Sequence, residues 1–333
     1  MASLLAHPQI AGKVSTMNAA IITGPGAIEI REVPLPEPAP HEVRVRVHTC
    51  GVCASNVPPW EGRPWFSYPM APGALGHEAC GTIDLVGADV PDWEVGTPVA
   101  VLSQHAFAEF DLATPDTMVR LPPSLAHSSF LGEPLGCAMN IFLRSGIRAG
   151  DRVAIVGVGF LGSLLVQLAL GSGAEVVACA RRAESLQLSQ DLGAKSLCLT
   201  EDRGENIERA KELTDGQLFD VTIEATGKQE PLDLAAELTR ERGRLVIAGY
   251  HQDGPRQINL QLWNWRGLDV INAHEREPRL YLEGIRAAID AVLAGRIDPI
   301  SLITHHFTLE GLHDALVLTR DRPDGFMKAV ITL

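Results

Sequence analysis

The sequence has little positive charge. Its 333 residues include 28 Lys and Arg against 41 Asp and Glu, which gives a formal net charge of −13. Proteins that bind nucleic acid neutralise its phosphates with clustered Lys and Arg, so this balance argues against a nucleic-acid partner. The six cysteines are unevenly spaced, which excludes a disulfide framework and favours reduced thiols or metal ligation.

The sequence also lacks an unbroken apolar run of the length that crosses a membrane. Residues 153–174 carry no charged side chain, but glycines interrupt them repeatedly. A buried strand, a phosphate-binding turn and a buried helix explain this segment better than a membrane span. Residues 1–16 contain too short an apolar stretch for a secretory signal, and we interpret them as a flexible extension before Met17. We expect a cytoplasmic protein with no membrane contact.

The order of predicted strands and helices indicates a globular chain with two different lobes. Up to about residue 121, short strands alternate with proline-rich turns, which is typical of an irregular β lobe. From residue 151, six strands alternate mostly with helical stretches, which predicts a Rossmann fold, a doubly wound parallel sheet of the α/β class. The expected strands are 20–23, 28–32, 42–49, 79–86 and 99–102 in the first lobe and 152–156, 175–180, 196–199, 220–224, 244–248 and 269–273 in the second.

The tail after residue 277 is too small to fold alone, so we expect it to return to the first lobe. It contains an expected helix at 281–294, a strand near 302–307, a helix from 309 and a final strand at 328–333. The predicted domains are therefore 1–138 for the first lobe, 139–276 for the Rossmann domain and 277–333 for the return.

A glycine fingerprint marks the start of the second lobe. The segment Gly157–Gly162 reads GVGFLG and lies between an apolar strand and a helix. Gly157 permits a tight turn, Gly159 lets the backbone approach a pyrophosphate, and Gly162 lets the helix pack on the strand. We expect this segment to open a helix whose free N–H groups suit the phosphates of a dinucleotide, and we expect Phe160 and Leu161 to belong to the cofactor site with the glycines. A glycine-rich turn without a ligand is the alternative.

The end of the second strand of this lobe indicates which dinucleotide binds. NAD enzymes place an acidic residue there, but this chain has Ala180 followed by Arg181 and Arg182. Two arginines can form charge-assisted hydrogen bonds to a 2′-phosphate, which favours NADP over NAD. Arg181 and Arg182 could instead be solvated residues that lead into the next helix.

Four motifs follow one another along the chain: GVCASN at 51–56, GHE at 76–78, EPL at 133–135 and the fingerprint at 157–162. Together they resemble the motifs of the zinc-containing medium-chain dehydrogenase/reductases, and within them those of the polyol dehydrogenases related to sorbitol dehydrogenase. The resemblance extends over nearly the whole chain from Met17. It implies a GroES-like, mostly β catalytic domain before the Rossmann domain, and a homodimer or homotetramer.

The resemblance also implies one catalytic zinc ion, held by Cys53, His77 and Glu133 with a fourth position open. Cys137 competes for the third place, because alcohol dehydrogenases proper have a cysteine there. Glu133 lies 24 residues before Gly157, as in the polyol branch, so we favour Glu133. Two arrangements stay open: Glu133 can reach the metal through a water, and Glu78 can lie behind the ligands or replace one.

The other cysteines give no second metal site. Cys50 and Cys53 have the spacing of a redox dithiol or half a zinc knuckle, but no second such pair exists and no helix is expected to begin there. We interpret Cys50 as a strand thiol. Cys80 is the only cysteine between His77 and Glu133, so the family's structural zinc lobe is missing.

The implied reaction is hydride transfer between a nicotinamide ring and a secondary alcohol or ketone, with zinc polarising the oxygen. Ser55 matches the family hydroxyl that accepts the substrate proton, and its alternative is an ordinary loop serine. The chain departs from the family at two places. Pro58 replaces the histidine that passes the proton on, and Asn56 replaces an aspartate behind the ligands.

We expect the small-molecule substrate to be a polyol, cyclitol or sugar. Trp60 belongs to a mixed aromatic and charged loop, 60–66, which suits hydroxyl-rich ligands but could equally pack an interface between lobes. His274, Glu275 and Arg276 follow the sixth strand and face the cleft if ligands bind at the carboxyl ends of the strands; a structural ion pair is the alternative.

Three other functions remain as alternatives. They are a zinc-dependent aldehyde or ketone reductase with a non-sugar substrate, a metal-free quinone or enoyl reductase, and a non-catalytic NADP-binding protein. The metal-free branch lacks the cysteine and histidine ligands, so Cys53, His77 and Glu133 argue against it.

Overall fold

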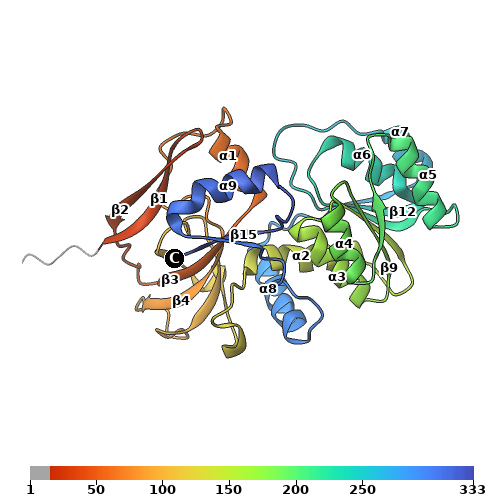
Figure 1. Ribbon diagram of the computed structural model, residues 1–333. Coiled ribbons are helices and arrows are strands. Elements are labelled where there is room, and N and C mark those ends of the chain that lie inside the picture. The colour runs from red at the N-terminus through yellow and green to blue at the C-terminus, as the bar shows by residue number, and fades with distance from the viewer. Residues whose placement is uncertain (1–15) are drawn as a thin grey trace, which may run out of the picture.

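The computed structural model describes residues 16–333 as two lobes joined by a helical region. The proposed flexible extension, residues 1–16, lies outside the described part except for Thr16. Figure 1 shows the lobes side by side, with α2, α8 and β15 between them. None of the helices in residues 16–333 combines the length and apolarity that a membrane span requires.

The N-terminal lobe is built from strands, as the sequence predicted. It contains β1 (Thr16–Gly24), β2 (Ala27–Pro34), β3 (Val43–Val52), α1 (Val57–Glu61), β4 (Glu78–Val86), β5 (Pro98–Leu102), β6 (Phe110–Ala113) and β7 (Met118–Arg120). β1 and β2 form a separate antiparallel ribbon, and the other five strands join a sheet centred on β3 and β4. The short strands β6 and β7 were missed by the sequence analysis.

The second lobe is a parallel sheet with helices on its faces. Its elements are β8 (Arg152–Val156), α3 (Phe160–Gly171), β9 (Glu175–Ala180), α4 (Ala183–Asp191), β10 (Lys195–Cys198), α5 (Arg203–Leu213), β11 (Phe219–Glu224), α6 (Gln229–Leu238), β12 (Thr239–Ile247), α7 (Leu260–Arg266) and β13 (Asp269–Asn272). The strand order is β10-β9-β8-β11-β12-β13, and all neighbours are parallel. This order confirms the doubly wound α/β fold.

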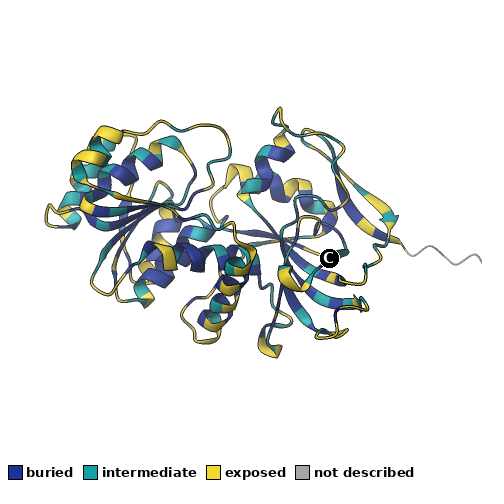
Figure 2. Ribbon diagram, turned by 180° about the vertical axis from the view of Figure 1, so that it is seen from behind, coloured by how far each residue is buried: buried dark blue, intermediate teal, exposed yellow. Residues whose placement is uncertain are grey.

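The strands of this lobe are apolar because both faces of the sheet are covered. The middle three residues of β8 are fully buried, and Figure 2 shows the buried residues gathered on the sheets and on the inner faces of the helices. The segment 153–174, which carries no charge, is therefore β8, the glycine turn and α3, as expected.

The C-terminal tail returns to the first lobe. It contains α8 (Pro278–Leu293), β14 (His305–Phe307), α9 (Leu312–Asp321) and β15 (Ala329–Thr332). β15 pairs with β3 in antiparallel fashion and β14 pairs with β15, so the tail extends the sheet of the N-terminal lobe. The domain limits themselves stay predictions.

A helix that the sequence analysis did not predict joins the lobes. α2 (Gly132–Ser145) contains Glu133 and packs against α8. The helices approach closely because glycines face the contact: a β-carbon on Gly136 would lie 2.8 Å from the side chain of Ile285, and one on Gly284 would lie 2.6 Å from that of Asn140. This contact places residues of the tail beside Glu133.

Candidate metal and dinucleotide site

Three predicted site residues converge where β3 ends and β4 begins in the N-terminal lobe. One ligand atom each from Cys53, His77 and Glu78 lies within 4.8 Å of the other two. A thiolate, an imidazole and a carboxylate are the donors that zinc prefers, so the residues present fit a zinc ion. Glu133 is not a member of this set, and its ligation of the metal stays a prediction.

A short helix presents Cys53, contrary to expectation. Cys53 caps a 3₁₀ turn, Ala54–Asn56, that continues into α1, so the prediction that no helix begins here was wrong. The backbone N–H of Cys53 donates to the side-chain oxygen of Asn56 at 2.9 Å, which closes the turn. Cys50 lies buried on β3, as expected, and burial raises the pKa of its thiol.

Asn56 and a strained loop also hold His77. The carbonyl of Leu75 lies 2.9 Å from Nδ1 of His77 and 2.9 Å from the side-chain nitrogen of Asn56. Leu75 has a φ of 74°, which is rare for a branched residue and turns this carbonyl inward. If Nδ1 donates to the carbonyl, Nε2 is the nitrogen left for a metal. The backbone carbonyl of Leu75 thus helps to orient the imidazole of His77.

The charges around His77 favour a cation. Burial lowers its pKa, but the hydrogen bond from His77 to Cys53 and the negative charges of Cys53, Glu133 and Glu78 outweigh burial and raise the pKa to about 10. The group therefore collects negative charge around one imidazole. A metal ion would replace the proton there and neutralise the same charges.

Lys328, which the sequence analysis missed, balances part of this charge. Its ammonium lies 2.5 Å from Oε2 of Glu78, and both side chains are buried. Oε1 of Glu78 is also buried, without a hydrogen-bond partner in the described residues. Such an orphaned oxygen is costly unless something binds it, which is further support for a cation here. No spacing rule links Lys328 to Glu78, because they meet only when the tail returns to β3.

Glu133 lies on the first turn of α2 and contacts Tyr281 of α8. The Tyr281 hydroxyl donates to Oε1 of Glu133 at 2.5 Å, and Cys137 contacts both residues. Burial raises the pKa of Glu133, with the positive charge of His77 opposing it. Tyr281 is a second residue that the sequence analysis missed.

The other catalytic candidates lie near Cys53. Ser55 is half-buried in the turn after Cys53. Pro58 belongs to α1 and carries no proton that could be relayed. Trp60 is 3% exposed, belongs to the core of the N-terminal lobe and lies edge-on to His313 of α9. It therefore packs within this lobe and not at an interface between the lobes, and its contact with substrate stays a prediction.

The glycine turn has the geometry that a dinucleotide needs. Gly157 has a φ of 99°, which a residue with a side chain rarely adopts. A β-carbon on Gly162 would lie 2.0 Å from the Gly157 carbonyl, whereas one on Gly159 would meet nothing within 4 Å. Phe160 and Leu161 begin α3 directly after the open space at Gly159.

The two arginines after β9 differ in their surroundings. Arg181 is exposed, whereas Arg182 is half-buried and donates to the carbonyl of Phe326 at 2.9 Å. Arg182 therefore links the Rossmann lobe to the tail.

The residues after β13 lie at the carboxyl edge of the sheet. His274 is half-buried with its ring 5.3 Å from that of Tyr250, and Arg276 is exposed. The Glu275 side chain accepts from the backbone N–H groups of Arg276 and Glu277, and neither Glu275 nor Arg276 joins an ion pair among residues 16–333.

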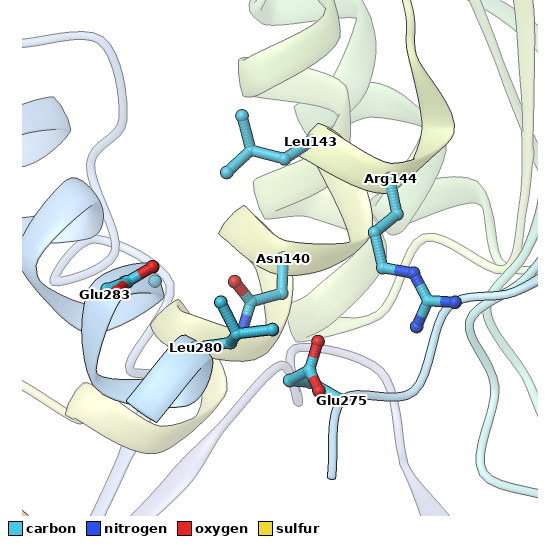
Figure 3. Close-up of a pocket in the computed structure, with 7 residues that line it drawn as sticks. Asn140, Leu143, Arg144, Glu275, Leu280 and Glu283 are labelled. Carbon is cyan, nitrogen blue, oxygen red and sulfur yellow. The ribbon is translucent and has the colours of Figure 1, made fainter. Parts of the chain in front are cut away.

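A cavity of about 220 Å³ lies between α2 and α8, apart from the metal ligands. It is lined by Asn140, Leu143, Arg144, Glu275, Leu280, Glu283 and Gly284. Figure 3 shows Arg144 and Glu275 on one side of it and Glu283 on the other. It contains none of the predicted ligands.

Comparison with known proteins agrees with this geometry. Residues 39–138 match the alcohol dehydrogenase GroES-like domain and residues 161–286 match the zinc-binding dehydrogenase family. The chain belongs to the zinc-type medium-chain dehydrogenase/reductases. Within this superfamily it falls in the sorbitol dehydrogenase branch, and it is an alcohol dehydrogenase by family.

Individual relatives cover most of this dehydrogenase. Sorbitol dehydrogenase of Gallus gallus is 29% identical over 342 residues, which cover 91% of this chain and 93% of the relative. That of Homo sapiens is also 29% identical, over 87% and 89% of the two chains. A zinc-binding dehydrogenase from Sinorhizobium meliloti 1021 bound to NADP superposes with a TM-score of 0.83 at 27% identity, over 96% and 100% of the chains.

Proposed function

We propose that this dehydrogenase transfers a hydride between NADP and a secondary alcohol or its ketone, and that the alcohol is a polyol, cyclitol or sugar. The convergence of Cys53, His77 and Glu78 carries the proposal, because a binding protein needs no such donor set beside a dinucleotide turn. The names of the sorbitol dehydrogenase relatives support a hydroxyl-rich substrate.

The residues have separate roles in this proposal. Cys53 and His77 would hold the zinc ion, with Glu133 as the third ligand, and Glu78, which lies with Cys53 and His77, could replace Glu133. When bound, zinc lowers the pKa of the substrate alcohol and nicotinamide accepts the hydride. Ser55, two residues after Cys53, takes the alcohol proton. Since Pro58 cannot relay it, the proton leaves Ser55 through water or the cofactor ribose.

The test is a panel of alcohols with matched carbonyl compounds. Zinc per chain is measured first, and then reduction of NADP is followed with linear polyols, cyclitols, sugars and simple secondary alcohols. We expect about one zinc ion per chain and the highest kcat/KM on a hydroxyl-rich secondary alcohol. A preference for apolar alcohols or aldehydes would instead support the non-sugar alternative.

The cofactor proposal rests on Arg181. Its side chain is exposed beside Ala180, where NAD enzymes carry an acid, and the relative from Sinorhizobium meliloti was solved with NADP. We expect Arg181→Ala to lower kcat/KM for NADP about tenfold or more and to leave that for NAD within about twofold, because a charge-assisted bond to phosphate is lost.

Arg182→Ala is the matched comparison for this prediction. It removes a neighbouring positive charge, but that charge is engaged with the carbonyl of Phe326. We expect it to lower thermal stability more than cofactor preference. A shift of the NADP/NAD ratio by Arg182→Ala alone would show that Arg182 binds the phosphate.

We also propose a homodimer formed through the edge of the Rossmann sheet. β13 ends the sheet order, so its outer backbone groups are unpaired within the described chain. Val270 of β13 is 38% exposed, and Trp265, four residues before the strand begins, is 84% exposed. A second copy of the chain, related by two-fold symmetry, can pair with the outer backbone groups of β13 and cover the exposed side chains of Val270 and Trp265.

Light scattering at micromolar concentration tests the dimer. We expect wild type to be dimeric and Trp265→Lys to shift it toward monomer with little loss of folding, since Trp265 is already in contact with solvent. Leu293→Lys, at a residue that is 53% exposed on α8, is the control and should stay dimeric. A monomeric wild type would contradict the proposal.

A further inference from the structure

The contact between α2 and α8 brings a phenol to the metal site. Tyr281 lies on the first turn of α8, and its hydroxyl reaches Oε1 of Glu133 at 2.5 Å although 148 residues separate them. Figure 1 shows α2 and α8 adjacent at the junction of the lobes. The close approach of these helices at Gly136 and Gly284 makes the contact possible.

The direction of this hydrogen bond follows from the groups. An ionised carboxylate only accepts, so the phenol is the donor. The thiol of Cys137 also donates to Oε1 of Glu133, at 3.6 Å, and touches the Tyr281 oxygen. Oε1 therefore has two donors. No donor to Oε2 is present in the described protein.

The two oxygens of the Glu133 carboxylate therefore differ. Oε1 is held by hydrogen bonds from the protein, whereas Oε2 accepts none within the described residues. Groups behind a metal ligand commonly fix it in this way, because a ligand that is already oriented loses less freedom when the ion binds. Glu133 is half-buried, as is Tyr281, so the fixed carboxylate is not sealed inside the core.

We propose that Tyr281 is a positioning residue of the zinc site, which holds Oε1 of Glu133 so that Glu133 serves the metal through Oε2 alone. The inference rests on the zinc site of the proposed function. It explains why Glu133 lies outside the set formed by Cys53, His77 and Glu78. That set forms without Glu133, and Tyr281 determines how Glu133 complements it.

The test measures metal affinity rather than turnover. The full-length wild type, Tyr281→Phe, Glu133→Gln and the double variant are compared for zinc dissociation constants by chelator competition. We expect Tyr281→Phe to weaken zinc binding about 10- to 100-fold, as is typical when a partner behind a ligand is removed. The double variant should bind no more weakly than Glu133→Gln, because Tyr281 acts through Glu133.

Two further measurements separate positioning from folding. Cobalt substituted for zinc should show a changed visible spectrum in Tyr281→Phe, because the ligand field changes, while thermal unfolding of the metal-free proteins should differ little. Tyr68→Phe is the matched control, since it also removes a phenol that donates to an oxygen, the carbonyl of Pro59. It should leave both the affinity and the spectrum unchanged.

The outcomes are distinct. If Tyr281→Phe had the zinc dissociation constant and the cobalt spectrum of wild type, the inference would be overturned. It would also be overturned if the losses of zinc affinity in the two single variants added up in the double variant, because Tyr281 would then be a packing residue. Cys137→Ala should weaken zinc binding by less than about threefold, because a thiol is a weak hydrogen-bond donor. If it weakened zinc binding as much as Tyr281→Phe does, Cys137 would be the positioning residue instead. A wild type that binds no zinc would contradict the proposed function itself.

Discussion

Replacing Cys53 with serine is expected to abolish turnover and to leave dinucleotide binding intact. Cys53 supplies the only thiolate of the convergent set, and a neutral serine hydroxyl is a poor zinc ligand. Loss of the ion removes the group that lowers the pKa of the alcohol. We expect kcat/KM to fall by about three orders of magnitude or more, since a Lewis acid is worth several kcal/mol in the transition state.

Three measurements on one preparation check this prediction: zinc per chain, kcat/KM for the best alcohol, and the dissociation constant of NADPH by fluorescence. The zinc content should fall with activity, whereas the NADPH constant should stay within about twofold, because the glycine turn belongs to the other lobe. Cys198→Ser is the control, as Cys198 is an exposed thiol on β10. Turnover that survives both Cys53→Ser and chelation would favour the metal-free reductase.

The Rossmann lobe could be predicted closely from the sequence. β8 and β9 have the expected limits and the other strands come within a few residues at each end except β12, which begins earlier. These strands are covered on both faces, so they appear as apolar runs, and Gly157 ends β8 where the backbone has a positive φ. Local composition is enough to predict this lobe, because six strands that alternate with helices pack in one common way, as a doubly wound parallel sheet.

The helix α2 shows why the rest could not be predicted. Gly132, Pro134 and Gly136 stand in its first turns, where they give no helical signal, and Leu131 provides no side-chain cap at its start. Glu133 could be assigned only by resemblance. Its hydrogen bond to Tyr281 depends on how α2 packs on α8, and no local pattern contains that information.

The two carboxylates of the site make the same point. The motif GHE puts Glu78 next to His77 in the sequence, but the ion pair of Glu78 with Lys328 appears only when the tail joins β3. Resemblance to the polyol branch favoured Glu133 as the third ligand. The structure adds that Glu78 lies with Cys53 and His77 while Tyr281 holds Glu133, which are facts about packing across lobes.

The second large effect is expected at the glycine turn, where alanine at Gly162 and alanine at Gly159 should affect stability and NADPH binding differently. A β-carbon on Gly162 would lie 2.0 Å from the backbone oxygen of Gly157, and a backbone atom cannot move aside cheaply. Gly162→Ala should therefore separate α3 from the turn. We expect a loss of about 1–3 kcal/mol in the free energy of unfolding, as for other overpacked sites, together with weaker NADPH binding.

Gly159→Ala should behave differently, because its β-carbon would meet no atom within 4 Å and its φ of −79° suits alanine. We expect stability to be unchanged or slightly higher, since alanine reduces the freedom of the unfolded chain. The added methyl group would nevertheless fill the space through which the pyrophosphate approaches the backbone, so NADPH binding should weaken about tenfold or more.

Gly171→Ala completes the comparison, because Gly171 ends the same helix and also has open space around its β-carbon. It should leave stability unchanged or slightly higher, as Gly159→Ala does, and it should not alter NADPH binding. Urea unfolding and NADPH titration of the three variants then separate two causes that a single substitution would confuse. NADPH binding by Gly159→Ala that equals wild type would mean that the pyrophosphate does not lie on this turn, whatever Gly162→Ala does to the fold.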